Sequence, residues 1–238
     1  ATVFTRSDEY REAMCSLGID AARIERLHAG IDLTKFGAER RDRSVWERNG
    51  CRPADVRAIY VGRVSVEKGL PLLARVWRDA EMELARRGVR ASLAIVGDGP
   101  YRAEMERALD GASVDFLGFR HGEELATLYA SADFFVFPSA TDTLGQVVIE
   151  AQRSGLPVLV TDLGGPCTVM QSDRTGLVLP ANSDRAWREA IVALGADGAR
   201  RRAMGTAAAA WAERFGFGRS FEHICQALER IARAYHRA

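Results

Sequence analysis

The sequence predicts one doubly wound α/β domain, in which a parallel sheet carries helices on both faces and further helices follow at the C-terminus. Between residues 56 and 180, short apolar segments alternate with segments whose apolar residues recur at helical spacing. The apolar segments are nearly continuous, as is typical of strands that are buried on both faces. Because strands separated by helices pair in parallel through right-handed crossovers, these two patterns together indicate the fold class.

The segment before this alternation predicts a small strand–helix–strand unit and a connection. We expect strands at residues 2–5 and 23–27, with a capped helix at residues 7–17 that ends at Gly18. Residues 37–55 are rich in charge and contain glycine and proline, which favours a connecting segment with one short helix.

The alternating region then supplies the sheet, and the chain ends in helices. From Asp184 onward the pattern is helical only and closes in a long amphipathic segment, residues 221–236. We expect strands at residues 56–61, 92–96, 114–117, 134–137, 158–160 and 177–179, and helices at residues 67–87, 101–109, 122–129 and 144–153.

Composition excludes several classes of protein. The chain has 238 residues, of which 47% are hydrophobic and 27% charged, with a net charge of +1. No bulk positive field therefore recruits nucleic acid or an anionic membrane. The four cysteines match no metal or redox spacing, which indicates reduced thiols in a cytoplasmic protein. No apolar run reaches the roughly 20 residues that a membrane span needs.

Ligands of an open parallel sheet bind beyond the carboxyl ends of its strands, so the residues there are the candidate site. Gly62 follows the first strand and lets a ligand approach the backbone. Arg63 and Lys68 come next, and two cations five residues apart suit a diphosphate. The alternative is an ordinary helix start, in which Arg63 pairs with Glu67 and Lys68 lies in solvent.

Two weaker signals follow the next strands. Residues 97–100 read Gly-Asp-Gly-Pro, which either admits a base or phosphate or forms a plain turn. The run is not a dinucleotide fingerprint, because the last glycine of that pattern is missing. Phe119 ends the third strand and either lies against a ligand's ring or belongs to the core.

The stretch from residue 134 to residue 165 carries the strongest signal. It reads strand, polar loop, helix, stop and strand, with Asp142 and Glu150 on either side of Gly145. The helix predicted from Leu144 leaves its first N–H groups unpaired, which is an anion site by geometry. Glu150 lies among apolar residues, where a carboxylate is costly unless it accepts hydrogen bonds, and sugar hydroxyls could donate them. The alternative is that Glu150 lies on a partly exposed face of the helix. Asp142 alternatively caps the helix.

Together these stretches resemble the nucleotide-sugar-binding half of GT-B glycosyltransferases, a Rossmann-like domain, and specifically of the retaining group called family 4. The matching runs follow the family's order over about residues 1–180 and are YVGRVSVEKGL, LAIVGDGPYRAEME, VDFLGFRHGEELATLYASADFFVFPS, DTLGQVVIEAQRSGLPVLVTDLGGP and TGLVLP.

The resemblance implies a role for each matching position. Arg63 and Lys68 are expected to neutralise the leaving diphosphate, and Asp142 to lie beside the donor sugar. Glu150 matches the second acid of the family's Glu-x7-Glu motif, which binds the ribose hydroxyls. The remaining expected binding residues are Thr143, Leu144 and Gly145 at the phosphates, with Gly62, Val96, Gly97 and Phe119 around the base.

The sequence departs from the family pattern at two places. Asp142 is one methylene shorter than the usual Glu, and Cys167 and its neighbours stand where an acid often follows the Gly-Gly-Pro run. Members of the family generally use no metal or other cofactor. The chain contains no Asp-x-Asp run, which agrees with that expectation.

The resemblance also implies partners. We expect residues 1–36 to lead in from an N-terminal, acceptor-binding half that this chain lacks, residues 56–180 to form the core, and residues 184–238 the helical tail. The donor would be UDP-, GDP- or another nucleoside-diphosphate sugar. The acceptor would be a glycan or glycolipid of bacterial polysaccharide or lipopolysaccharide synthesis, reached at the inner membrane face. An apolar face on residues 221–236 predicts weak self-association.

Three other functions fit parts of the pattern. The first is a non-catalytic nucleotide-sugar-binding or scaffold domain, and the second is a sugar epimerase of the same architecture. The third is an NAD-dependent oxidoreductase, which the incomplete glycine fingerprint disfavours.

Overall fold

The structure is a computed structural model that describes residues 2–5, 8–27 and 30–235. Six strands form one parallel sheet in the order β5-β4-β3-β6-β7-β8. The chain reverses its direction of progress between β3 and β6, which confirms the doubly wound topology and places the switch point there. The strands are β3 (Val56–Val61), β4 (Ala91–Val96), β5 (Val114–Gly118), β6 (Phe134–Phe137), β7 (Val158–Thr161) and β8 (Gly176–Leu179).

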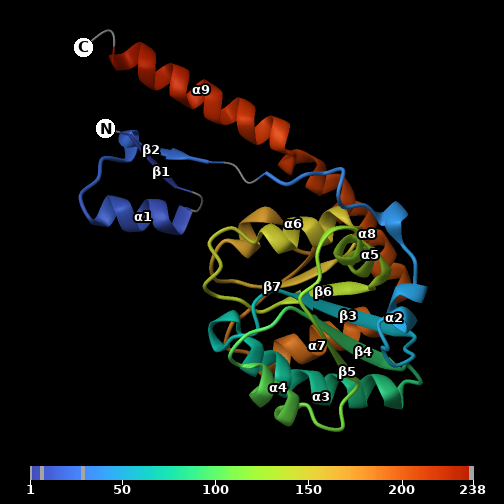
Figure 1. The fold of residues 1–238 in the computed structure, drawn as a ribbon. Helices are drawn as coiled ribbons and strands as arrows, with labels where there is room; N and C mark the ends of the chain where they lie inside the picture. Colours follow the sequence, from blue (N-terminus) through green and yellow to red (C-terminus); the bar gives the residue numbers. More distant parts are fainter. Residues whose placement is uncertain (1, 6–7, 28–29, 236–238) are drawn as a thin grey trace.

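Helices cover both faces of this sheet. Figure 1 shows α5, α6 and α8 over one face and α3, α4 and α7 over the other. The bounds of these helices and of the short α2 are α2 (Ser44–Arg48), α3 (Leu70–Arg86), α4 (Arg102–Ala108), α5 (Gly122–Ser131), α6 (Gln146–Arg153), α7 (Asp184–Ala196) and α8 (Gly198–Ala212).

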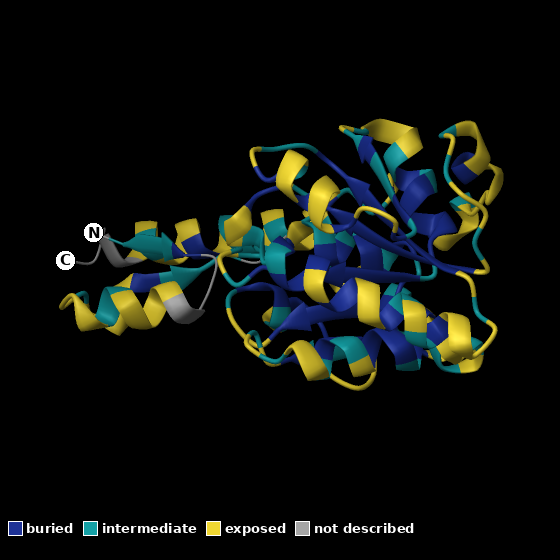
Figure 2. Ribbon diagram, turned by 90° about the horizontal axis from the view of Figure 1, so that it is seen from below, coloured by how far each residue is buried: buried dark blue, intermediate teal, exposed yellow. Residues whose placement is uncertain are grey.

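The core lies in the central strands. Every residue of β3, β4, β6 and β7 is buried, and the centre of the sheet is dark blue in Figure 2. The indole rings of Trp77 on α3 and Trp187 on α7 are completely buried where these helices pack together. Removal of so many apolar side chains from water is the main force that holds the two helical layers against the sheet.

A smaller unit lies away from the sheet, beside the last helix. Strands β1 (Val3–Thr5) and β2 (Ile24–Arg26) pair in parallel around α1 (Asp8–Ser16), next to α9 (Phe217–Tyr235) in Figure 1. The chain after β2 joins the start of α9, because the Ile31 amide donates to the carbonyl of Phe215 at 2.8 Å. An ion pair between Arg230 and Glu25 also links them, with nitrogen and oxygen 2.9 Å apart.

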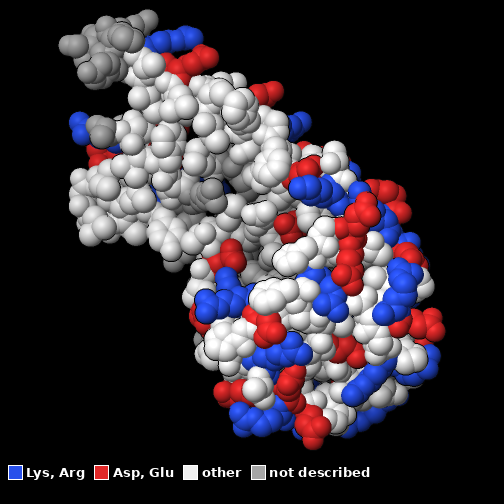
Figure 3. Space-filling view, viewed as in Figure 1, with Lys and Arg blue, Asp and Glu red and all other residues white. Residues whose placement is uncertain are grey.

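The charged side chains are unevenly spread between the two parts of the molecule. In Figure 3 both signs are interspersed over the main body, whereas the visible face of the smaller unit and α9 is largely uncharged. Phe217, Phe221 and Leu228 of α9 are exposed, and self-association through this helix stays a prediction. Within the described ranges, no helix has the length and apolarity needed to cross a membrane.

Two predicted helix boundaries are wrong, and both errors fall near the candidate site. Helix α6 begins at Gln146 and not at Leu144, because Gly145 adopts the left-handed conformation with φ 74°. The helix predicted over residues 67–87 is divided at Gly69, also left-handed, into a short 3-10 helix and α3. Ser7 and His236, at the ends of two other predicted helices, lie outside the described residues.

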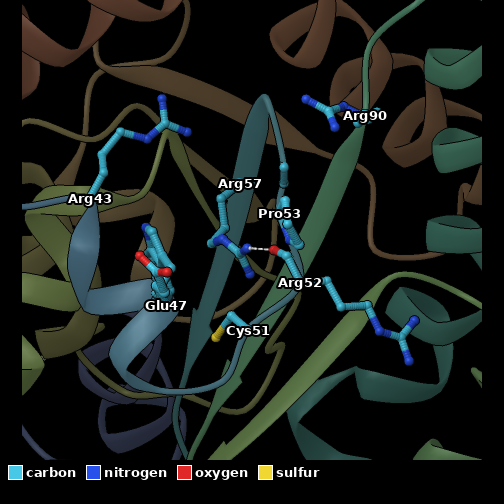
Figure 4. Close-up of a pocket in the computed structure, with 9 residues that line it drawn as sticks. Arg43, Glu47, Cys51, Arg52, Pro53, Arg57 and Arg90 are labelled. Atoms are coloured by element: carbon cyan, nitrogen blue, oxygen red, sulfur yellow. Dashed lines mark hydrogen bonds between the residues drawn. The ribbon is translucent and has the colours of Figure 1, made fainter.

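A buried ion pair lies at the opposite, amino-terminal edge of the sheet. The guanidinium of Arg57 on β3, only 2% exposed, donates to Asp115 of β5 at 2.6 Å and to Ser92 of β4 at 3.2 Å. It also donates to the carbonyl of Arg52, the dashed bond in Figure 4. The sequence alone gave no role to this arginine, although it interrupts an apolar strand. Its bonds hold three neighbouring strands together.

Candidate functional site

The ends of β3, β4 and β5 form a continuous main-chain surface, called the floor below. The Gly62 amide donates to the Val96 carbonyl at 3.0 Å, and the Gly97 amide to the Gly118 carbonyl at 2.8 Å. Gly97 has φ 125°, and a Cβ there would lie 2.0 Å from the Gly62 carbonyl oxygen, so only glycine fits. The Val96 side chain is 1% exposed, and this residue therefore faces the site only through its backbone.

Lys68 and Asp142 form an ion pair across the switch point. Lys68 Nζ lies 2.9 Å from Asp142 Oδ2, and both side chains are largely buried. Gly69 makes this approach possible, because any Cβ at that position would lie 2.2 Å from the carbonyl oxygen of Pro138. The alternative in which Lys68 lies in solvent is therefore wrong.

Asp142 also binds the loop that leads into α6. Its Oδ1 accepts hydrogen bonds from the Gly145 amide at 2.8 Å and from the Leu144 amide at 3.3 Å. Burial raises the pKa of the Asp142 carboxyl, but the bonds from Gly145, Lys68 and Leu144 outweigh burial and hold this pKa below its ordinary value. The amides of Leu144 and Gly145, which were predicted to be unpaired, are thus paired, and both precede the first residue of α6.

A second loop fixes the position of these amides. The Gly165 amide donates to the carbonyl of Asp142 at 2.8 Å, and a Cβ on Gly145 would lie 2.8 Å from Pro166. Thr143 is exposed beside them. Cys167, which stands where the family often has an acid, donates its thiol to the Gly164 carbonyl at 3.2 Å.

Arg63 stands at the mouth of the same region. Its side chain is exposed, and its positive charge attracts the carboxylate of Glu67 without a close ion pair. Its carbonyl accepts a hydrogen bond from the Tyr60 hydroxyl at 2.8 Å, which fixes the backbone after β3. The guanidinium of Arg63 thus remains at the surface.

Glu150 is half-buried on α6 and has polar partners. The Tyr129 hydroxyl donates to its Oε2 at 3.2 Å, and the Gln146 amide group donates to its Oε1 at 3.4 Å. Burial dominates and raises the pKa of Glu150 to about 7, although both hydrogen bonds oppose the rise. Its intermediate burial agrees with the alternative of a partly exposed helix face. Tyr129, which lies 21 residues away in sequence, could not be predicted as its partner.

We expect Glu150→Gln to stabilise the protein in a pH-dependent manner. The pKa of Glu150 rises from 4.5 to about 7 on folding, so the folded state binds this proton more tightly than the unfolded state. The free energy of unfolding therefore falls as pH rises through that window, and the neutral Gln escapes the loss. Urea unfolding should show a gain of about 2 kcal/mol near pH 8 and almost none near pH 4.

The matched control for this substitution is Glu12→Gln on the exposed face of α1. It should leave the free energy of unfolding within about 0.5 kcal/mol at both pH values. An equal gain for Glu150→Gln at the two pH values would contradict the raised pKa as its cause.

The strand end after β5 presents an aromatic ring to solvent. Phe119 is 64% exposed and lies nearly parallel to the His121 ring, with ring centroids 6.4 Å apart. The alternative that Phe119 belongs to the core is therefore wrong. The turn at residues 97–100 is closed by its own contacts, because Asp98 accepts from the Gly99 amide at 2.7 Å and pairs with Arg102.

Across the residues that the structure describes, no three His, Cys, Asp or Glu side chains are grouped so that they could hold a metal ion. The positive groups at the switch point are instead the Lys68 ammonium and the N-terminal end of α6.

A doubly wound sheet with a cation and a helix N-terminus at its switch point is the architecture of nucleotide-binding α/β domains. The family profile described as "Glycosyl transferases group 1" matches residues 55–197 of the chain. The chain therefore belongs to the glycosyl transferases group 1 family.

Individual relatives agree with this membership. The D-inositol 3-phosphate glycosyltransferase of Nocardia farcinica is 32% identical over 247 residues, which cover 99% of this chain and 54% of that protein. Sucrose-phosphate synthase of Thermosynechococcus elongatus superposes with a TM-score of 0.80 at 26% identity, covering 98% and 59% of the two chains. Anabaena HepE, solved in complex with UDP-glucose, has the same fold, with a TM-score of 0.83, 20% identity and coverage of 96% and 64%.

The chain thus spans about half to two thirds of the length of these three proteins, as the coverage of 54%, 59% and 64% shows.

Proposed function

We propose that this chain is the donor-binding half of a GT-B glycosyltransferase of family 4, which transfers a sugar with retention from a nucleoside-diphosphate sugar. The convergence of Lys68 with the Leu144 and Gly145 amides at the switch point carries this proposal. Membership of the family supports sugar transfer, and the UDP-glucose complex of HepE supports a nucleoside-diphosphate donor.

Each group at the site has a chemical task in this proposal. Lys68 and Arg63 neutralise the charge that develops on the leaving diphosphate, together with the dipole of α6. These cations supply the electrostatic stabilisation, so the proposed reaction needs no metal. Glu150 accepts hydrogen bonds from the ribose hydroxyls, and Asp142 lies beside the donor sugar.

The base and phosphates take the remaining positions. The floor formed by Gly62, Val96 and Gly97 lies under the base, and Phe119 borders it. Thr143 stands beside the amides that bind the phosphates.

We also propose how this chain connects to an acceptor-binding half. Residues 1–36 and 184–238 would join the donor domain to an acceptor-binding half, which takes a glycan or glycolipid in polysaccharide or lipopolysaccharide synthesis. The protein would act in the cytoplasm, at the inner membrane face.

Calorimetric titration with UDP and with GDP tests the donor site. We expect at least one of them to bind with a Kd of about 1 mM or tighter, as is usual for enzyme substrates. Uridine and guanosine serve as controls that lack the diphosphate and should bind at least tenfold more weakly. A folded sample that binds no nucleoside diphosphate would exclude the proposal.

A non-catalytic nucleotide-sugar-binding domain is the second candidate, because Lys68 is paired with Asp142 of the chain itself. Assay of the longer parent protein with a labelled donor separates the two. Binding of the donor without any transfer or hydrolysis favours the second candidate.

A further inference from the structure

Three hydrogen-bond donors of the proposed phosphate site converge on one carboxylate of the chain itself. Asp142 Oδ1 accepts from the Leu144 amide at 3.3 Å and from the Gly145 amide at 2.8 Å. Asp142 Oδ2 accepts from Lys68 Nζ at 2.9 Å. Both oxygens of the carboxylate are therefore engaged with groups that would also serve a bound phosphate.

The two backbone amides cannot serve two anions at once. Each backbone amide has one hydrogen to donate, and Lys68 Nζ is held toward the carboxylate. A phosphate placed on the same amides would also stand beside a like charge, which is unfavourable in a partly buried site. An anion that binds these two amides must therefore break their bonds with Asp142 first.

The length of the side chain explains why this arrangement forms. An Asp carboxylate reaches amides two and three residues ahead in the chain, as in the turns that Asx residues make. A Glu has one more methylene and fits this local turn poorly. The shorter acid at position 142 thus gives this chain an internal anion at the start of α6.

We propose that Asp142 is a specificity-determining competitor: its carboxylate binds the donors that the phosphates would use, and a nucleoside diphosphate binds by displacing it from them. This inference rests on the proposed function. Displacement requires a ligand that brings more negative charge than the carboxylate, which selects diphosphates over neutral or singly charged ligands. After sugar transfer, the return of Asp142 to the same donors promotes release of the nucleoside diphosphate.

The test is the affinity of Asp142→Asn for UDP, GDP and inorganic pyrophosphate, measured by calorimetry. Asn keeps an oxygen that can cap α6 but carries no charge, so we expect roughly tenfold tighter binding of pyrophosphate and of the nucleotide that the wild type binds. Asp79→Asn is the matched control, because it makes the same substitution at an exposed carboxylate of α3 that has no part in the proposed site. It should change the affinity by no more than about twofold.

The position of the carboxylate in the bound state is a second readout. The carboxyl 13C signal that disappears in Asp142→Asn identifies Asp142 in the wild type. Saturation with the nucleotide should raise the pKa that this signal reports, because the carboxyl loses its donors and gains an anionic neighbour.

Three results would overturn the inference, and the third would also exclude the proposed function. Binding to Asp142→Asn that equals or falls below that of the wild type refutes the competition. So does a carboxyl signal whose pKa stays low in the saturated complex. If neither folded protein binds any nucleoside diphosphate, the proposed function itself fails together with the inference.

Discussion

Lys68→Met is expected to weaken nucleoside-diphosphate binding by roughly 30-fold, the loss that follows removal of one partner from a desolvated charge pair. Met preserves most of the length of the side chain but removes the ammonium group. Asp142 then keeps its negative charge and its two amide bonds at the place where the phosphate must bind. Calorimetric titration with UDP or GDP measures the change.

The sequence offers a matched control for Lys68, since Lys35 is its only other lysine. Lys35 is largely exposed in an ion pair with Asp32, and Lys35→Met should leave the affinity unchanged within about twofold. Adding Asp142→Asn to Lys68→Met should restore at least about threefold of the affinity, because the uncompensated carboxylate is gone. Equal losses from the two lysine substitutions would contradict a phosphate contact by Lys68.

Arg57→Met should destabilise the folded protein by about 3–5 kcal/mol. The substitution leaves Asp115, whose side chain is 11% exposed, without its cation in the interior. It also removes the bonds to Ser92 and to the Arg52 carbonyl, and the stacking of the guanidinium on the Trp46 ring at 4.6 Å. Equilibrium unfolding in urea is the measurement.

The exposed ion pair between Arg90 and Asp55 is the control for this prediction. Arg90→Met should cost no more than about 1 kcal/mol, because water screens the pair. Adding Asp115→Asn to Arg57→Met should recover part of the loss, since it neutralises the unpaired charge. A loss from Arg57→Met no larger than that from Arg90→Met would show that the pair does not hold the strands together.

The sheet could be predicted from the sequence because its strands are buried on both faces. Residues 56–61 and 134–137 are almost uninterrupted apolar runs, and both match β3 and β6 to the residue. The helix starts were less predictable. Whether Gly145 continues a helix or takes a positive φ depends on the contact with Pro166, which is distant in sequence.

The candidate site was predictable in its residue types but not in its pairings. Lys68 and Asp142 were each predicted at the donor site, but 74 residues separate them in sequence and their bond depends on the tertiary fold. Similarly, the exposure of Phe119 follows from the way β5 ends, and an aromatic residue after a strand carries no signal of it. The local sequence therefore indicated which types of side chain follow the strand ends, whereas tertiary packing determined which of these side chains pair with one another.

The floor at the ends of β3, β4 and β5 is made of main-chain groups, so its chemistry depends little on side chains. Its surface consists of peptide groups, and the space at Gly97 is filled by the carbonyl of Gly62. Substitutions elsewhere in these strands change the core but not the chemical groups that the floor presents. In the proposed function, residues around the rim, such as Phe119 and Arg63, would then set the donor preference, while the floor presents the same groups to the nucleotide.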